Sequence, residues 1–196
     1  MAYTAKNYDH LLGTPGFSDT ALKNHFTLYQ GYVTNTNKVA EVLTKMMANP
    51  PAGGGTPEYN ELKRRFGWEF NGMRIHEYYF GSISKTGSAI DKPSPLYDKV
   101  VEDFGSWEAW EKDYIATATM RGIGWAILYH DPDANRLFNV WVNEHDLGHL
   151  GGCKILLPID VFEHAYITDY GLKRADYVSA FMKAVDWGIV SGRFSV

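Results

Sequence analysis

Two long stretches with helical spacing, separated by a segment that cannot be helical, constrain the fold of this chain more than any other feature. Residues that share one face recur at steps of three and four from Leu22 to Leu43, and again from Leu62 to Phe80. The segment 49–57 between them contains prolines and three consecutive glycines, which end a helix. The sequence therefore predicts an antiparallel hairpin of two long helices joined by this loop.

Each predicted helix carries one histidine on its apolar face. The first face consists of Leu22, His25, Tyr29, Tyr32, Thr36, Val39 and Leu43, and the second of Leu62, Phe66, Phe70, Met73, His76 and Phe80. A lone histidine on such a face is commonly a hydrogen-bonded core residue, and this interpretation stays open for His25 and His76 taken singly. Two of them on helices that pack together favour a metal site, because neutral imidazole is the commonest protein ligand for metals and helical bundles build such sites from facing helices.

The second half of the chain changes pattern after a break rich in glycine, serine and proline between residues 81 and 95. Apolar and aromatic runs on either side of the turn 131–135 indicate a β-hairpin, and Pro158 suggests an edge strand or a strand end. The sequence predicts helices over 94–104, 106–121 and 175–190, and strands over 124–129, 137–142 and 155–160. We expect an α+β fold: a helical hairpin domain, 1–83, then a C-terminal α+β domain, 92–196, whose small three-stranded antiparallel sheet is a meander.

A further chemical feature follows the last predicted strand. Asp160 ends that strand, and His164 comes four residues later, where a helix would begin. An oxygen and a nitrogen presented across this turn can face one ion, although capping of the helix by Asp160 would also explain the pair. With His25 and His76 they make three nitrogens and one oxygen, which suits iron, manganese or zinc better than calcium or magnesium. We expect this metal site between the two domains.

A second pair of histidines, His145 and His149, has the spacing of the zinc protease motif His-Glu-x-x-His, with Asp146 in the glutamate position. That motif requires a helix, whereas a predicted strand precedes His145 and Gly148 interrupts the segment. A zinc-dependent hydrolase that uses His145 and His149 is therefore the less favoured alternative. A polar turn after a strand is the simpler interpretation.

Composition excludes several classes of function. The net charge of −4 argues against a nucleic-acid-binding protein, which would usually carry a basic stripe. No apolar run approaches the length of a membrane span, and the N-terminus lacks the apolar core of a signal peptide. The single cysteine, Cys153, excludes an internal disulfide and favours a reducing compartment, so we expect a cytoplasmic protein. Aromatic residues reach 15%, and such residues often wall a dry site or an interface.

The sequence resembles the iron and manganese superoxide dismutases. The segment Asp160-Val-Phe-Glu-His-Ala-Tyr166 resembles the family signature Asp-x-Trp-Glu-His-Ala-Tyr. Other segments that resemble the family, in the family's order, are 24–33, 70–76, 122–126 and 170–178. The resemblance therefore covers nearly the whole chain, from Tyr8 to Trp187.

This resemblance implies dismutation of superoxide to oxygen and hydrogen peroxide at one iron or manganese ion per subunit. The implied metal ligands are His25, His76, Asp160 and His164, with solvent as a fifth ligand. Among the implied catalytic residues, Tyr32 would be the gate and proton relay, and His145 would tune the site. Residues that the resemblance places around the ligands or on the access path are Tyr29, Trp125, Phe162, Glu163, Tyr166 and Arg174. The same ligands serve iron and manganese, so either metal is expected.

Two of these residues carry a further implication. Arg174 stands at the position of a funnel arginine, which would draw the superoxide anion inward. Glu163 resembles the family glutamate that bridges to His164 of the other subunit, so the resemblance implies a homodimer, or a tetramer built from it. A non-catalytic member of the same fold that keeps the metal is a second alternative.

The chain departs from the family pattern at several places. The spacing from His25 to Tyr32 is seven residues, where the family usually has eight, so an ungapped count would put Asn24 at the ligand position. We favour His25, because asparagine is a poor ligand for such a site. Other departures are Phe162 in place of a tryptophan, Tyr29 in place of a gateway histidine, Ile167 in place of a tyrosine, and His145 where many members carry a glutamine.

Overall fold

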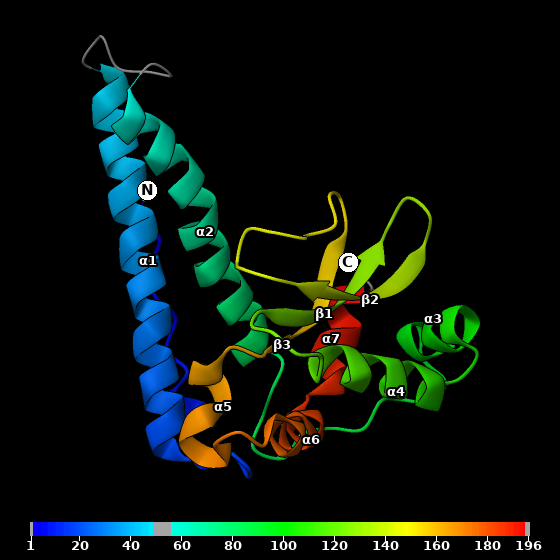
Figure 1. The fold of residues 1–196 in the computed structure, drawn as a ribbon. Helices are drawn as coiled ribbons and strands as arrows, with labels where there is room; N and C mark the ends of the chain where they lie inside the picture. Colours follow the sequence, from blue (N-terminus) through cyan, green and yellow to red (C-terminus); the bar gives the residue numbers. More distant parts are fainter. Residues whose placement is uncertain (1, 49–55, 195–196) are drawn as a thin grey trace.

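The computed structural model describes residues 2–48 and 56–194, and its N-terminal part is a pair of long antiparallel helices (Figure 1). After a 3₁₀ turn, η1 (Asp9–Leu11), the chain forms α1 (Asp19–Ala48) and α2 (Pro57–Phe80). The hydroxyl of Thr56 accepts the Tyr59 N–H and Pro57 occupies the first turn, which are common features of a helix start. The predicted hairpin is confirmed, whereas most of its predicted loop, residues 49–55, lies outside the described residues.

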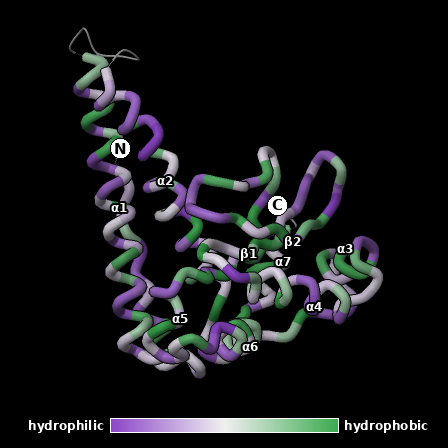
Figure 2. The backbone as a smooth tube through the Cα atoms, viewed as in Figure 1, coloured by the Kyte–Doolittle hydropathy of each residue, from purple (hydrophilic) through white to green (hydrophobic). Residues whose placement is uncertain are grey.

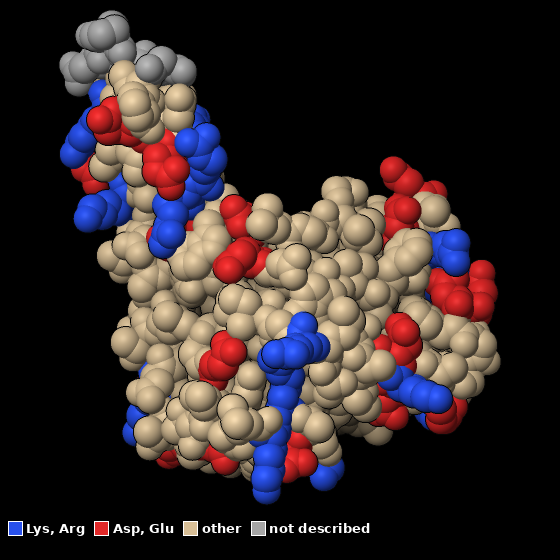
Figure 3. Space-filling view, in the orientation of Figure 1, with Lys and Arg blue, Asp and Glu red and all other residues tan. Residues whose placement is uncertain are grey.

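The buried faces of the two helices differ in extent. On α1 all seven residues of the predicted face are buried, and hydrophobic and hydrophilic residues alternate along this helix (Figure 2). On α2, Met73, His76 and Phe80 are buried, but Leu62, Phe66 and Phe70 are only half-buried. The reason is that the far end of the hairpin projects beyond the rest of the molecule, where charged residues cover it (Figure 3).

Close approach of the two helices depends on a glycine. A Cβ atom on Gly72 would lie 2.6 Å from the ring of Tyr32, so any side chain at this position of α2 would displace that ring. The ring of Tyr32 instead stacks on His76, with 5.2 Å between the ring centroids. Gly72 thereby brings a residue of α1 beside a histidine of α2.

The C-terminal part surrounds a small antiparallel sheet (Figure 1). Its elements are α3 (Pro95–Phe104), α4 (Trp107–Ala118), β1 (Trp125–Asp131), β2 (Arg136–Val142), β3 (Lys154–Asp160), α5 (Glu163–Tyr170), α6 (Arg174–Ala184) and α7 (Trp187–Phe194). The α+β class is confirmed, and so is the edge position of Pro158, which pairs with Ile127 across β3 and β1. Within the described ranges no helix is both long and apolar enough to cross a membrane.

The strand order differs from the predicted meander. The order is β2-β1-β3, so β1 lies in the centre and pairs with both other strands. The prediction was wrong because the segment after β2 carries the chain across to the far side of β1, which is almost completely buried and suits the central place. As a result the first residue of β1, Trp125, lies opposite both Val142 and Asp160.

The predicted closing helix 175–190 is two helices, because the chain is extended between α6 and α7. Val185 forms a β-bridge with Ile83, and Asp186 forms one with Ser88. These residues therefore bond to the loop after α2 instead of continuing a helix. The tertiary pairing overrides a local apolar pattern that is compatible with one continuous helix.

Candidate metal centre

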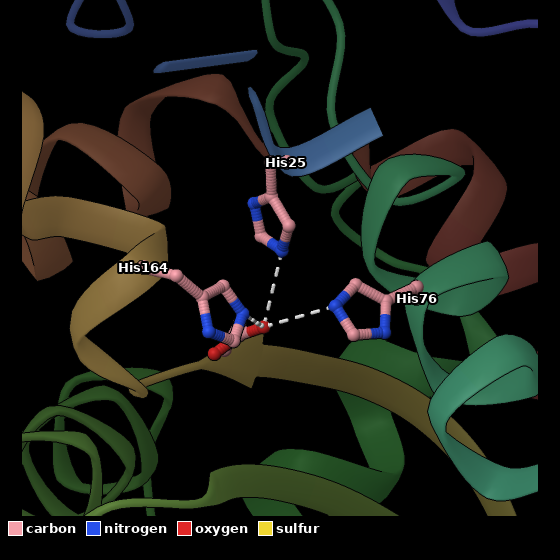
Figure 4. A group of neighbouring side chains, drawn as sticks. His25, His76 and His164 are labelled. Carbon is pink, nitrogen blue, oxygen red and sulfur yellow. Dashed lines mark hydrogen bonds and ion pairs between the residues drawn. The ribbon is translucent and has the colours of Figure 1, made fainter. Parts of the chain in front are cut away.

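Four side chains from four different elements converge where the hairpin meets the sheet. The three histidines among them point towards one another (Figure 4). His25 comes from α1, His76 from α2, Asp160 from the end of β3, and His164 from the first turn of α5. The Oδ2 atom of Asp160 lies 3.2 Å from Nε2 of His25, 3.3 Å from Nε2 of His76 and 3.1 Å from Nε2 of His164. The four candidate ligand atoms all lie within 4.8 Å of one another.

Hydrogen bonds to neighbouring residues fix the position of Asp160. Its Oδ1 atom accepts the backbone N–H of Phe162 at 2.9 Å, and its backbone carbonyl accepts the hydroxyl of Tyr177 at 2.7 Å. The hydroxyls of Tyr177 and Tyr79 lie 3.0 Å apart. With Oδ1 engaged in this way, Oδ2 is the oxygen that faces the three histidines.

The His76 ring shows that these atoms are not a self-sufficient hydrogen-bond network. Its Nδ1–H donates to the backbone carbonyl of Gly72, which leaves a lone pair on Nε2 in the neutral ring. Nε2 is buried, has no hydrogen-bond partner, and faces the carboxylate oxygen of Asp160 at 3.3 Å. Two acceptor atoms in this position repel each other unless a cation lies between them.

The residues present fit a bound transition-metal ion. Ligand atoms that bind one ion at about 2.0–2.2 Å lie roughly 3 Å apart when they are at right angles, close to the distances from Asp160 Oδ2 to the three histidine nitrogens. His25, His76 and Asp160 are buried, and the side chain of His164 is 31% exposed. Three imidazole nitrogens with one carboxylate oxygen form a donor set suited to iron, manganese or zinc.

The electrostatics favour the metal-binding forms of His25 and Asp160, and favour protonation of His164 when no metal is bound. Burial lowers the pKa of His25 to about 4, so this ring is neutral at physiological pH. Burial alone would raise the pKa of Asp160, but the adjacent histidines, His164 above all, hold it well below its usual range. Burial alone would lower the pKa of His164, but the effect of the adjacent Asp160 carboxylate is stronger and the pKa is raised.

The rings of Tyr32, Trp125 and His145 pack against His76 and form a second layer around the four candidate ligands. The Nε1–H of Trp125 donates to Nδ1 of His145 at 3.1 Å, and Nε2 of His145 lies 2.8 Å from the hydroxyl of Tyr32. Burial lowers the pKa of His145 to about 3, so the ring is neutral. Because Nδ1 accepts from Trp125, the ring proton is on Nε2 and is donated to the Tyr32 oxygen. The hydroxyl proton of Tyr32 is then free for another acceptor.

The sequence is similar to those of proteins whose names include iron or manganese, the metals that this donor set suits. Residues 92–193 match the family model described as "Iron/manganese superoxide dismutases, C-terminal domain". The "Superoxide dismutase [Mn] 2" of Haloferax volcanii is 38% identical over 189 residues, which is 95% of this chain and 90% of that protein. The "Superoxide dismutase [Fe]" of Aquifex pyrophilus is 34% identical over 191 residues, 95% and 89% of the two chains. The chain belongs to the iron/manganese superoxide dismutase family.

Two further family positions wall the site. The ring of Trp125 lies 5.1 Å from His76, and the ring of Phe162 lies 5.5 Å from His164 and 5.0 Å from His145, centroid to centroid. Phe162 therefore occupies the place beside the ligands that the superoxide dismutase signature assigns to tryptophan. Both rings are buried and exclude water from this side.

Other residues expected around the ligands have different surroundings. Tyr29 is fully buried, where its hydroxyl donates to Glu77 and accepts the N–H of Lys6, and it makes no ring or hydrogen-bond contact with the four ligand candidates. Tyr166 is buried, and its hydroxyl accepts a hydrogen bond of 3.3 Å from Arg174. Glu163 is exposed at the start of α5.

Arg174 has an additional role in the structure. Its guanidinium donates to the backbone carbonyls of Met120 and Gly122, at 2.5 Å each, as well as to Tyr166. These bonds fix the loop that leads into β1 and hence the start of the strand that carries Trp125. The family resemblance gave no sign of these bonds, which depend on where the loop passes.

The structure also separates the competing histidine and asparagine assignments. Asn24 is exposed, whereas His25 is buried in the group. Both ring nitrogens of His145 are engaged by Trp125 and Tyr32, and those of His149 lie 2.6 Å from the Tyr129 hydroxyl and 2.7 Å from the His145 carbonyl. With these nitrogens occupied and the segment not helical, the zinc hydrolase alternative is not favoured.

Trp68 and Glu144 also lie beside the site, although the sequence did not predict them there. The ring of Trp68 lies 4.9 Å from His145 and 5.3 Å from Tyr32, and its Nε1–H donates to Glu144 at 3.2 Å. A signal for Trp68 was available: residues 68, 72 and 76 are spaced by four and share one face of α2. Nothing comparable marks Glu144, whose contact depends on the path of a loop.

Proposed function

We propose that the protein is a superoxide dismutase with one iron or manganese ion per chain, held by His25, His76, Asp160 and His164. The observation that carries this conclusion is the set of three imidazole nitrogens around one carboxylate oxygen, in which His76 and Asp160 face each other without a shared hydrogen bond. The relatives that support it carry manganese or iron in their names.

A bound iron or manganese ion supplies the electron exchange, by which one superoxide is oxidised to oxygen and a second is reduced to peroxide. Two protons must reach the reduced species to make hydrogen peroxide. Tyr32 is the proton donor that we propose, because its oxygen accepts from His145 Nε2 and its own hydroxyl proton remains available. Burial raises the pKa of Tyr32, which keeps that proton on the oxygen at physiological pH.

His145 and Trp125 prepare Tyr32 for this role. The indole N–H of Trp125 fixes the tautomer of His145, and this tautomer fixes the direction of the bond to Tyr32. Trp125 and Phe162 exclude bulk water, so the hydrogen bonds act in an environment of low dielectric. Arg174, which donates to the Tyr166 hydroxyl, is the residue whose positive charge we propose attracts the superoxide anion.

We further propose a homodimer, or a tetramer built from it. Its support is the start of α5, where Glu163 is exposed and the His164 side chain is partly exposed, so Glu163 of one subunit can reach His164 of the other. Ile167 on the same helix is 48% exposed and would be covered in such a contact.

The domain division and the location are proposals as well. Two of the four proposed ligands come from residues 1–83 and two from 92–196, so a metal ion would join the two domains across their boundary. The single cysteine supports a cytoplasmic location.

Elemental analysis and a superoxide-consumption assay on one purified preparation test this function. We expect iron or manganese in a ratio of about one per chain, with activity that is lost on chelation and restored by adding the metal back. Zinc as the only stoichiometric metal, without superoxide consumption, would contradict the proposal.

A further inference from the structure

His149 is the one member of the 145–149 histidine pair that the proposed function leaves without a role. It is half-buried, and both of its ring nitrogens have partners. Its Nε2 lies 2.7 Å from the backbone carbonyl of His145, which can only accept, so Nε2 carries a proton. In the neutral ring Nδ1 is then an acceptor, and the Tyr129 hydroxyl donates to it at 2.6 Å.

The segment that carries His145 has little other support from the backbone. Residues 144–149 belong to no helix or strand, and no backbone–backbone hydrogen bond reaches them from elsewhere in the ranges 2–48 and 56–194. Side chains hold the segment instead. They do so through Trp68 to Glu144, Trp125 to His145, and Tyr129 through His149 to His145.

The local geometry allows His149 to reach back to His145. Gly148 has a φ of +94°, a conformation that side chains other than glycine rarely adopt, and it lies against the end of β2. This turn directs the following ring towards the carbonyl four residues earlier. Tyr129 in turn is buried on β1, the central strand, and is paired there with residues of both β2 and β3.

We propose that His149, oriented by Tyr129, is a positioning residue that holds the backbone of His145 and thereby keeps the His145 ring on the Tyr32 hydroxyl. The role rests on the proposed function, since His149 acts only through His145 and Tyr32. It also accounts for a histidine pair whose spacing resembles a zinc motif: the second histidine holds the first in place. His149 itself touches none of the proposed metal ligands in the described structure.

The test compares two substitutions of His149 in the metal-loaded enzyme. His149→Leu removes both hydrogen bonds, whereas His149→Gln keeps one donor for the His145 carbonyl and one acceptor for Tyr129. We expect His149→Leu to keep its metal but to lose about tenfold in turnover, an effect of the size expected for the loss of one hydrogen bond. His149→Gln should recover most of the lost turnover. Crystal structures of both variants should show the His145–Tyr32 contact, 2.8 Å here, broken in the first and kept in the second.

Two further variants separate positioning from a general loss of stability. Tyr129→Phe should act in the same direction as His149→Leu, and the double variant should be no worse than His149→Leu alone, because Tyr129 acts through His149. The matched control is His130→Leu. This neighbour of Tyr129 on β1 is also buried, but its ring bonds to Asn135 outside the segment, so turnover should not change.

Several outcomes would overturn the proposal: an unchanged His145–Tyr32 contact in His149→Leu, loss of metal from that variant, or no recovery in His149→Gln. The crystallographic readout does not depend on activity. If the wild-type enzyme did not consume superoxide but His149→Leu still displaced the His145 ring, the proposed function would fail and the positioning role would stand.

Discussion

The proposed metal ligands and the segment that carries His145 lie against each other, but they are held in different ways. The four ligand candidates lie on α1, α2, β3 and α5, and the regular backbone hydrogen bonds of these helices and of this strand support them. Residues 144–149 have no such regular backbone hydrogen bonds in the described structure. Hydrogen bonds from the side chains of Trp68, Trp125 and His149 hold them in place.

This difference in support predicts different effects of substitutions in the two regions. A ligand on a regular element cannot move without distorting the element, so its geometry is set when the chain folds. A ring on an irregular segment moves when one side-chain contact changes, at a cost of about 1 kcal/mol per hydrogen bond. We therefore expect substitutions among the ligands to abolish metal binding, and substitutions in the segment to adjust reactivity while the metal stays bound.

The largest effect is expected for Asp160→Asn, because its Oδ2 is the atom that all three histidines face. The amide keeps the shape but removes the charge, so metal affinity should fall by more than about a hundredfold and activity with it. Metal analysis after gel filtration measures this. Asp169→Asn is the control, since that carboxylate is exposed and accepts the Ser18 N–H. Stoichiometric metal in Asp160→Asn would exclude a dominant role for this ligand.

The next comparison uses two adjacent residues of α1. His25→Ala should abolish metal binding, because it removes a buried nitrogen of the group, whereas Asn24→Ala should leave metal content and activity near wild type, because Asn24 is exposed. Metal content and superoxide consumption are measured on both variants. If Asn24→Ala lost the metal and His25→Ala kept it, the ungapped family alignment would be right and our assignment wrong.

A smaller effect is expected for Tyr32→Phe. The variant keeps the ring that stacks on His76, so metal content should not change, but it lacks the proposed donor and turnover should fall by about tenfold or more. Turnover at saturating superoxide is the readout. Tyr170→Phe is a matched control, because that hydroxyl donates to Gly16 at the base of the hairpin. Equal turnover in Tyr32→Phe and wild type would assign the proton to another group.

The smallest effect is expected for His145→Gln, a substitution in the irregular segment 144–149. Glutamine can donate to Tyr32 and accept from Trp125, so the metal should stay bound and the enzyme active. We expect a shift in reduction potential; a tenfold change in a one-electron equilibrium corresponds to about 59 mV. Redox titration of the bound metal measures it. A variant that loses its metal would show that His145 supports the ligands as well.

Much of this molecule follows from local patterns in the chain. The hairpin and the buried face of α1 follow from helical spacing, because a helix turns by a constant angle per residue and places every third or fourth residue on one side. The closeness of Asp160 and His164 follows from the short turn between the end of β3 and the start of α5. His25 and His76 become candidates from their places on those faces. The donor types of all four residues indicate one metal site, and the family resemblance implies the same ligand set.

Contacts between distant segments decided the remainder. The order β2-β1-β3, the break between α6 and α7 at Val185, and the bonds of Arg174 to the loop before β1 each involve partners far apart in sequence. The same holds for the His145 tautomer, which depends on Trp125 as its donor. A local pattern tells which face of an element is apolar; which distant donor meets which acceptor is determined only when the packed chain brings them within hydrogen-bond reach.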